Sequence, residues 1–310
     1  MTDRRASSST TAVPPGTRVI VEVPATSANL GPGFDCFGLA LDWRDRVQLE
    51  VIESGFGAEV TGEGSGRLPT DASHLIVAAA LTGLDQLGRS VPGLRVRSHN
   101  TIPHARGLGS SSAAIVAGLA GALALAGQAP DREWLLRGAA AIEGHPDNVA
   151  AAIWGGFVLA YADPEAGADG WRVAQARVAR SVRGVVFIPE TAVSTRAARG
   201  LLPERVPHGE AAATAGRAGL FVHAMAADPE LLFAATREWL HQDYRRPVMP
   251  DSAALLERLR ADRQAAVISG AGPTVLVLGT SEELRPLLAG EWPGFTTRPV
   301  RPGPGVRVVG

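Results

Sequence analysis

The sequence predicts an α+β fold, and three observations lead to this prediction. Segments in which apolar and polar residues alternate, as in half-buried strands, lie among longer apolar or amphipathic segments that are typical of helices. These segments do not follow the regular strand-helix-strand order of a parallel sheet, and the chain lacks the G-x-G-x-x-G fingerprint of a dinucleotide-binding domain. With 310 residues, of which 45% are hydrophobic, the chain can bury a large core and is long enough for two lobes.

The first hundred residues are expected to consist of a tail followed by strands and one helix. Residues 1–16 are rich in Ser, Thr and Pro without an apolar run, so we expect them to be disordered and not a targeting signal. Alternation predicts strands over residues 18–23, 46–52 and 94–98. Between the first two strands we expect a turn over residues 29–34 and a linking segment over 38–42. Helical spacing predicts a helix over residues 71–87.

The middle of the chain is dominated by an uncharged helix. Residues 113–127 are rich in Ala and Gly and too few to cross a bilayer, so we expect a buried helix. A second helix is expected over residues 131–142 and a strand over 154–161. The acidic residues, Gly and Pro over 163–170 indicate a domain boundary or a surface loop.

The second half mixes helices and strands in the same irregular way. We expect a strand over residues 182–188 and a helix over 194–202 that Pro203 ends. Two helices rich in Ala and Leu follow over residues 211–226 and 229–239, and strands over 265–269 and 274–278 flank a glycine-rich turn.

Composition excludes several mechanisms. All 30 basic residues are arginine, so the chain has no lysine for a Walker A loop, a protein-kinase strand or a pyridoxal Schiff base. The net charge of -1 gives no reason to expect nucleic acid or a membrane as partner. Cys36 is the only cysteine, which rules out an intramolecular disulfide and fits a reducing cytoplasm.

The most informative stretch is the glycine- and serine-rich loop over residues 103–114. Gly107 and Gly109 allow backbone dihedrals closed to other residues, and Ser110 to Ser112 are candidates for the N-cap of the helix that follows. Free N–H groups at such a helix start form an anion site, and phosphate is the usual anion. An ordinary serine-capped helix with glycines for close packing is the alternative.

This loop, P-x-x-x-G-L-G-S-S-x-A-A, resembles the phosphate-binding motif of the GHMP small-molecule kinases. Two further segments, residues 23–35 and 268–274, lie where that family has its other motifs. The segments S-A-N-L-G-P-G-F-D, E-G-H-P-D-N, S-T-x-x-A-R and Y-R resemble the homoserine kinase branch. The resemblance implies a ribosomal-S5-like, ATP-binding N-terminal lobe over residues 17–172 and a ferredoxin-like C-terminal lobe over 173–310.

By the same resemblance the cofactors are ATP and Mg²⁺. Mg²⁺ prefers oxygen ligands, and the family's metal pair maps onto Ser111 and Glu143. Some homoserine kinases carry a longer insert after this Glu, whereas here only Gly144 separates it from His145; a surface carboxylate is the alternative for Glu143. The residues expected to hold the nucleotide are Pro103, Arg106, Gly107, Leu108, Gly109, Ser110, Ser111, Ser112, His74, Gly270 and Gly272.

The implied substrate is L-homoserine, which carries a carboxylate, an ammonium and the reacting hydroxyl. Arginine binds carboxylates through its planar fork, and acids and amides bind ammonium groups. The mapped residues are Arg199 and Arg245 for the carboxylate, Asn29 and Asp35 for the ammonium, and Thr195 and His145 along the same pocket.

The catalytic set expected from the resemblance is Glu143, Ser111, Asn148 and Asp147. Mevalonate kinases have an aspartate at the position of Asn148, so the identity of the base stays open. Asp147 could orient the loop only, with the hydroxyl proton passing directly to the phosphate.

Several alternatives stay open. The chain could be another GHMP kinase of the mevalonate type, or a binding protein that kept the fold without catalysis. No nucleic acid or membrane partner is expected, and a homodimer is left open. Cys36 is expected in the core, although a position near the substrate pocket is the alternative, and the other histidines are expected at the surface or in the core: His99, His208, His223 and His241.

Overall fold

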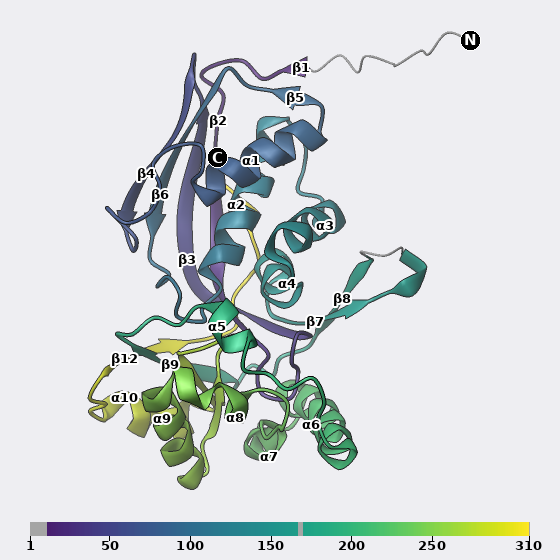
Figure 1. Cartoon of the computed structure of the whole chain (residues 1–310), viewed down its shortest axis with the longest axis vertical. Helices are drawn as coiled ribbons and strands as arrows, with labels where there is room; N and C mark the ends of the chain where they lie inside the picture. The colour runs from purple at the N-terminus through teal and green to yellow at the C-terminus, as the bar shows by residue number, and fades with distance from the viewer. Residues whose placement is uncertain (1–10, 167–169, 310) are drawn as a thin grey trace.

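The computed structural model describes residues 11–166 and 170–309 and shows two main sheets, each with its own helices, and a separate pair of two-residue strands (Figure 1). The predicted α+β class is confirmed, because strands and helices are mixed without a regular order. The first sheet and its helices form the upper part of the molecule in Figure 1, and the second sheet forms the lower part.

The first sheet has seven strands and mixed directions. Its strands lie in the order β13 (Arg307–Val308), β2 (Arg18–Ala28), β3 (Phe37–Val51), β6 (Gly93–Asn100) and β4 (Gly55–Gly62), with β7 (Phe157–Ala162) beside β3 and β8 (Trp171–Ala176) beside β7. The β4–β6 pair is parallel and the other pairs are antiparallel. Helices cover one face of this sheet: α1 (Leu75–Gln86), α2 (Ser110–Leu125), α3 (Arg132–Glu143) and α4 (Asp147–Trp154).

The second sheet is four-stranded and antiparallel, in the order β10 (Ala265–Ile268), β11 (Val275–Gly279), β9 (Arg183–Pro189) and β12 (Phe295–Val300). The helical elements of this half are α5 (Thr195–Arg199), α6 (His208–Ala226), η2 (Pro229–Leu231), α7 (Leu232–Ala235), α8 (Gln242–Arg245), η3 (Arg246–Val248), α9 (Pro250–Ala261) and α10 (Ser281–Ala289). A short turn of helix, η1 (Pro164–Ala166), follows β7.

The first two strands are longer than predicted. Strand β2 continues to Ala28, and β3 already begins at Phe37, so that residues 38–42 are strand and not a link. The sequence does not alternate here because Ala25 to Ala28 are all buried. The edge strand β4 was not predicted, since its Gly-containing residues are mostly exposed and give no apolar period.

The predicted disorder of residues 1–16 is wrong for its described part, and residues 1–10 lie outside the described residues. Strand β1 (Thr11–Ala12) pairs with β5 (Arg89–Ser90) in parallel. Val13 is buried and its N–H donates to the carbonyl of Ser90 at 2.9 Å. Burial of this side chain and the backbone pairing hold the segment.

Helix α2 is buried as predicted, between the first sheet and neighbouring helices (Figure 1). Its N-cap is Gly109 in a left-handed conformation, so the expected serine cap is wrong and Ser110 to Ser112 form the first turn. Among the described residues, no helix has the length and apolarity that crossing a membrane requires.

The helix expected over residues 229–239 is shorter than predicted. After η2, helix α7 ends at Ala235, and α8 begins at Gln242. The Glu238 carboxylate accepts the backbone N–H groups of His241 at 3.0 Å and Gln242 at 2.8 Å. This carboxylate therefore starts a new helix instead of continuing the old one.

The end of the chain returns to the first sheet. Strand β13 pairs with β2, and Pro304 forms a β-bridge with Gly155. The last described strand therefore belongs to the first sheet and not to the second. The chain therefore passes between the two main sheets twice, once from β8 to β9 and once from β12 to β13.

Candidate active site

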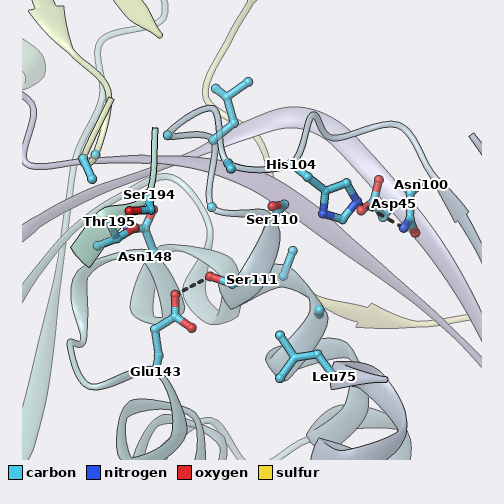
Figure 2. A pocket seen from close by; sticks show the side chains of 18 of the residues that line it. Asp45, Leu75, Asn100, His104, Ser110, Ser111, Glu143, Asn148, Ser194 and Thr195 are labelled. Carbon is cyan, nitrogen blue, oxygen red and sulfur yellow. Dashed lines mark hydrogen bonds between the residues drawn. The ribbon is translucent and has the colours of Figure 1, made fainter. Parts of the chain in front are cut away.

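A cavity of about 490 Å³ opens where the loops of the two halves meet. It is lined by residues from the glycine-rich loop, the α3–α4 link, helix α5 and the second glycine-rich turn, as Figure 2 shows in part. Most residues that the sequence analysis singled out lie here: Asn29, His74, Gly107, Leu108, Gly109, Ser110, Ser111, Glu143, His145, Asp147, Asn148, Thr195, Arg199, Arg245 and Gly270.

The glycines of the loop are required by close contacts. Gly107 has φ of 72°, and a Cβ there would lie 2.2 Å from the carbonyl oxygen of Ser269. Gly109 has φ of 68°, and its Cβ would lie 1.9 Å from Oγ1 of Thr26. The loop therefore lies flush against β2 and the second glycine-rich turn, and the start of α2 faces the cavity.

One carboxylate accepts hydrogen bonds from two serines of this helix start. Oε1 of Glu143 receives Oγ–H of Ser111 at 2.6 Å, drawn in Figure 2, and Oγ–H of Ser112 at 2.8 Å. Helix α3 ends at Glu143 because Gly144 follows in a left-handed conformation. The expected Ser111–Glu143 pair is thus brought together, whereas Ser112 is buried and does not line the cavity.

The start of α4 forms a second hydrogen-bonded group. Oδ1 of Asp147 accepts from Nδ1 of His145 at 2.8 Å and from the backbone N–H of Asn148 at 2.7 Å. Burial lowers the pKa of His145, but the hydrogen bond and charge of Asp147 outweigh it and raise that pKa overall. Oδ1 of Asn148 accepts Oγ1–H of Thr26 at 2.7 Å.

Arg245 is a buried cation without an acidic partner among the described residues. Its side chain is 1% exposed, and Nη1 donates to the carbonyl of Gly270 at 3.0 Å and to Nδ1 of His241 at 3.2 Å. Burial and the nearby charge of Arg199 lower the pKa of Arg245 to about 10. An anion in the cavity would relieve this electrostatic penalty.

Asp35 and Arg199 bind each other across the two halves. Nη1 and Nη2 of Arg199 donate to the two carboxylate oxygens of Asp35 at 3.0 and 2.6 Å. The hydrogen bonds to Asp35 raise the pKa of Arg199. Asp35 does not line the cavity itself, and its backbone N–H donates to Oδ1 of Asn29, whose Nδ2 donates to the carbonyl of Gly270 at 2.7 Å.

Besides Ser112, three of the expected nucleotide residues lie outside the cavity lining. The guanidinium of Arg106 donates to the carbonyls of Pro189, His104 and Glu190, and thus ties the loop to the end of β9. Pro103 and Gly272 do not line the cavity either; a Cβ on Gly272 would lie 2.6 Å from the side chain of Met249. We interpret these three residues as supports of the loop.

The end of the cavity nearest to β6 contains residues that the sequence analysis missed. His104, Asp45 and Asn100 line it, as Figure 2 shows, and Leu75 lies at the start of α1. Asp45 is buried and accepts the backbone N–H of Ile102 at 3.0 Å. An acidic residue inside the apolar alternation of β3 was the signal that could have revealed it.

His74 lies at the same end and is 3% exposed. Burial and the neighbouring His104 lower its pKa, and its Nδ1 atom has no partner among the described residues. Of the other histidines, three are exposed and His241 is buried, as expected for surface and core residues. Cys36 is half-buried, packs against the apolar core and does not line the cavity.

Comparisons with known proteins agree with this geometry. Residues 74–156 match the family profile described as "GHMP kinases N terminal domain". A homoserine kinase of Streptomyces avermitilis is 53% identical over 279 residues, covering 88% of this chain and 90% of the relative. A homoserine kinase of Streptomyces coelicolor is 51% identical over 280 residues, covering 88% and 89%. The crystal structure of a homoserine kinase from Cytophaga hutchinsonii superposes with a TM-score of 0.80 at 27% identity, covering 94% of this chain and 97% of the other.

Proposed function

The chain belongs to the homoserine kinases, a branch of the GHMP kinase family, and on that premise we propose that it transfers the γ-phosphoryl group of ATP to the hydroxyl of L-homoserine. The observation that carries this proposal is the pairing of two features in one cavity. A helix start suits phosphates, with Ser111 and Glu143 beside it for their divalent cation. The buried cation Arg245, which has no acidic partner among the described residues, suits the carboxylate of an amino acid.

We propose that ATP lies along the glycine-rich loop, with its phosphates at the start of α2. The backbone N–H groups of the first turn of α2 would bind phosphate oxygens. The adenine ring of ATP would occupy the end of the cavity that His74 and His104 line. The absence of lysine is compatible with this arrangement, because backbone amides and hydroxyls need no cationic side chain.

The donor set fits Mg²⁺. Ser111 and Glu143 offer one hydroxyl and one carboxylate, and Mg²⁺ is commonly held by one or two carboxylates, waters and substrate phosphates. No cluster of three or more His, Cys, Asp or Glu that could hold a metal exists in the part of the chain that the structure describes. When bound, Mg²⁺ would neutralise charge that develops on the phosphates.

For the substrate we propose that Arg245 and Arg199 bind the carboxylate and that Asp35 and Asn29 bind the ammonium. Asp35 and Arg199 neutralise each other without substrate. A zwitterionic ligand can insert its own two charges without leaving either side chain unpaired. Thr195 and His145 would complete the wall near the hydroxyl.

The acceptor proton is proposed to pass directly to the phosphate. Oδ1 of Asp147 already accepts from His145 and from the N–H of Asn148, and Asn148 Oδ1 is engaged by Thr26. We infer that Asp147 and Asn148 orient these neighbours. Positioning and electrostatic stabilisation supply most of the catalysis in this reaction class.

The division into lobes and the location in the cell extend this proposal. We assign the ribosomal-S5-like lobe to residues 17–172 and the ferredoxin-like lobe to 173–310, with β8 and β13 extending the first sheet. A reducing cytoplasm is the proposed location, since the chain has one cysteine and no disulfide of its own.

The test is a coupled assay of ADP release with ATP, Mg²⁺ and L-homoserine. We expect turnover that depends on all three. Arg245→Ala should raise the apparent KM for homoserine by about 100-fold, because a charge-assisted carboxylate contact is lost. Absence of ADP release with homoserine would contradict the proposed activity, and an unchanged KM in Arg245→Ala would contradict the role of this arginine.

A further inference from the structure

His241 is a fully buried histidine directly before helix α8, and it packs against the turn that contains Gly31 and Phe34. Nε2 lies 2.8 Å from the carbonyl oxygen of Gly31, and Nδ1 lies 3.2 Å from Nη1 of Arg245. Its ring stacks on Phe34, with centroids 5.2 Å apart. The His241 side chain therefore contacts Gly31, Phe34 and Arg245 at the same time.

These two contacts fix the tautomer of the ring. A carbonyl oxygen only accepts, so Nε2 must carry the hydrogen. A guanidinium only donates, so Nδ1 must be the acceptor. His241 is consequently neutral and protonated on Nε2, in agreement with the lowering of its pKa by complete burial.

The same contact restricts Arg245. Among the hydrogen bonds between described residues, those of its guanidinium are both made by Nη1, to His241 and to Gly270. Nε is buried and has no partner in the described part of the chain. Holding the Nη1 end leaves Nη2, which makes no hydrogen bond to the described residues, as the donor for a carboxylate.

We propose that His241 is a positioning residue for the substrate carboxylate, which it serves by holding the Nη1 end of Arg245 through its Nδ1 atom. The proposal rests on the proposed function, since it takes Arg245 as the carboxylate-binding residue. Glu238 and Phe34 support the ring: the former accepts the backbone N–H of His241 at 3.0 Å. His241 itself does not line the cavity.

Two conservative substitutions separate the two functions of the ring. In His241→Asn, the amide oxygen can take the place of Nδ1 and still accept from Arg245. In His241→Gln, the amide nitrogen can take the place of Nε2 and still donate to Gly31, but the acceptor for Arg245 is lost. Each variant is the control for the other, because both replace the aromatic ring by an amide.

We expect His241→Gln to raise the apparent KM for L-homoserine about tenfold, with kcat and the KM for ATP nearly unchanged, and His241→Asn to raise it less than about threefold. In the Arg245→Ala background, His241→Gln should have no further effect. If His241→Asn and His241→Gln raise the KM for homoserine equally, or if the effect of His241→Gln adds to that of Arg245→Ala, the proposal is overturned and His241 serves only to pack the core.

The failure of this inference and that of the proposed function give different results. If Arg245→Ala leaves the KM for homoserine unchanged, the carboxylate assignment fails. If Arg245→Ala raises the KM and His241→Gln does not, only the positioning role fails. Should the variants not fold, ¹H–¹⁵N NMR of the wild-type imidazole decides: a neutral Nε2–H ring supports the proposal, and an Nδ1–H or charged ring overturns it.

Discussion

At the scale of single residues, the central feature is the carboxylate of Glu143 between two hydroxyls. Both Ser111 and Ser112 donate to its Oε1 atom, although only Ser111 lines the cavity. Glu143 is thus fixed to the start of α2 and is not a free surface carboxylate at a helix end. This arrangement keeps the second carboxylate oxygen, Oε2, outside these two bonds and available to a cation.

The first prediction concerns this carboxylate. Glu143→Gln keeps the size of the side chain and its ability to accept from the serines, but removes the charge that Mg²⁺ requires, so kcat should fall about 100-fold or more. Steady-state kinetics at saturating Mg²⁺ measures this, with Glu257→Gln as a control on an exposed glutamate that is paired with Arg246. A rate close to wild type would show that Glu143 is not the ligand.

The second prediction concerns His74 and pH. Because burial lowers its pKa in the folded protein, the unfolded state binds more protons below about pH 6.5, and folding stability that is present above this pH is lost as pH falls. His74→Asn removes the titrating group, so the loss of unfolding free energy between pH 7.5 and about 5 should shrink by the order of 1 kcal/mol or less.

Urea unfolding at several pH values measures this difference. His208→Asn is the control, because it makes the same substitution at an exposed histidine. An identical pH dependence in wild type and His74→Asn would contradict the prediction.

Much of the residue-level site could be predicted because it follows motifs. Ser111 and Glu143 are brought together as the resemblance implied. The ion pair between Asp35 and Arg199 was not predicted, since their sequence separation is 164 residues and the pairing depends on how the two halves meet. The contact of His241 with Arg245 was missed because neither the tautomer nor the burial of a histidine can be read from its neighbours in sequence.

At the scale of elements, the glycine-rich loop and α2 act as one unit. The two ends of α2 carry glycines with similar left-handed backbones, Gly109 with φ of 68° and Gly127 with φ of 74°. Their surroundings differ, because a Cβ on Gly127 would meet open space and one on Gly109 would meet Thr26 and Asn148. The chain thus contains a matched pair for separating backbone strain from steric collision.

The third prediction uses this pair. Gly109→Ala should weaken ATP binding at least about tenfold, as the loop must move away from Thr26, and Gly109→Val should do so more strongly. Gly127→Ala carries a similar left-handed strain of about 1 kcal/mol but should leave ATP affinity unchanged. Calorimetric titration with ATP measures both. Equal affinity in Gly109→Val and wild type would contradict the assignment of the loop.

Long apolar or amphipathic segments were predicted well, and very short elements were not. Strand β9 and helices α2, α3 and α6 lie close to their expected positions. Helix α4 was missed because it has only eight residues, which is shorter than the window over which a helical period can be recognised. Strand β13 has two residues and exists only because the chain returns to β2, a long-range pairing that local sequence does not encode.

At the scale of the whole molecule, the cavity depends on contacts between both halves. The Asp35–Arg199 pair, the Asn29–Gly270 hydrogen bond and the bond from Ser269 Oγ to the carbonyl of Gly107 all cross between the first and second halves of the chain. The cavity is therefore a property of the assembled halves, since carboxylates of the first half (Glu143 and Asp147) and arginines of the second (Arg199 and Arg245) line it together.

The last prediction follows from this distribution of charge. L-homoserine can pair its carboxylate with Arg245 and its ammonium with Asp35, whereas mevalonate lacks the ammonium and galactose lacks both charges. Two smaller analogues isolate each charge: 4-hydroxybutyrate lacks only the ammonium and 3-aminopropan-1-ol lacks only the carboxylate. Arg245 is buried and Asp35 only half-buried, so loss of the carboxylate should cost more than loss of the ammonium. We expect kcat/KM to fall about 100-fold or more for 3-aminopropan-1-ol and about tenfold for 4-hydroxybutyrate, and mevalonate and galactose to be inactive. Mass spectrometry of the phosphorylated products across this panel is the measurement. Phosphorylation of mevalonate or galactose without phosphorylation of homoserine would show that the pocket is built for a different acceptor.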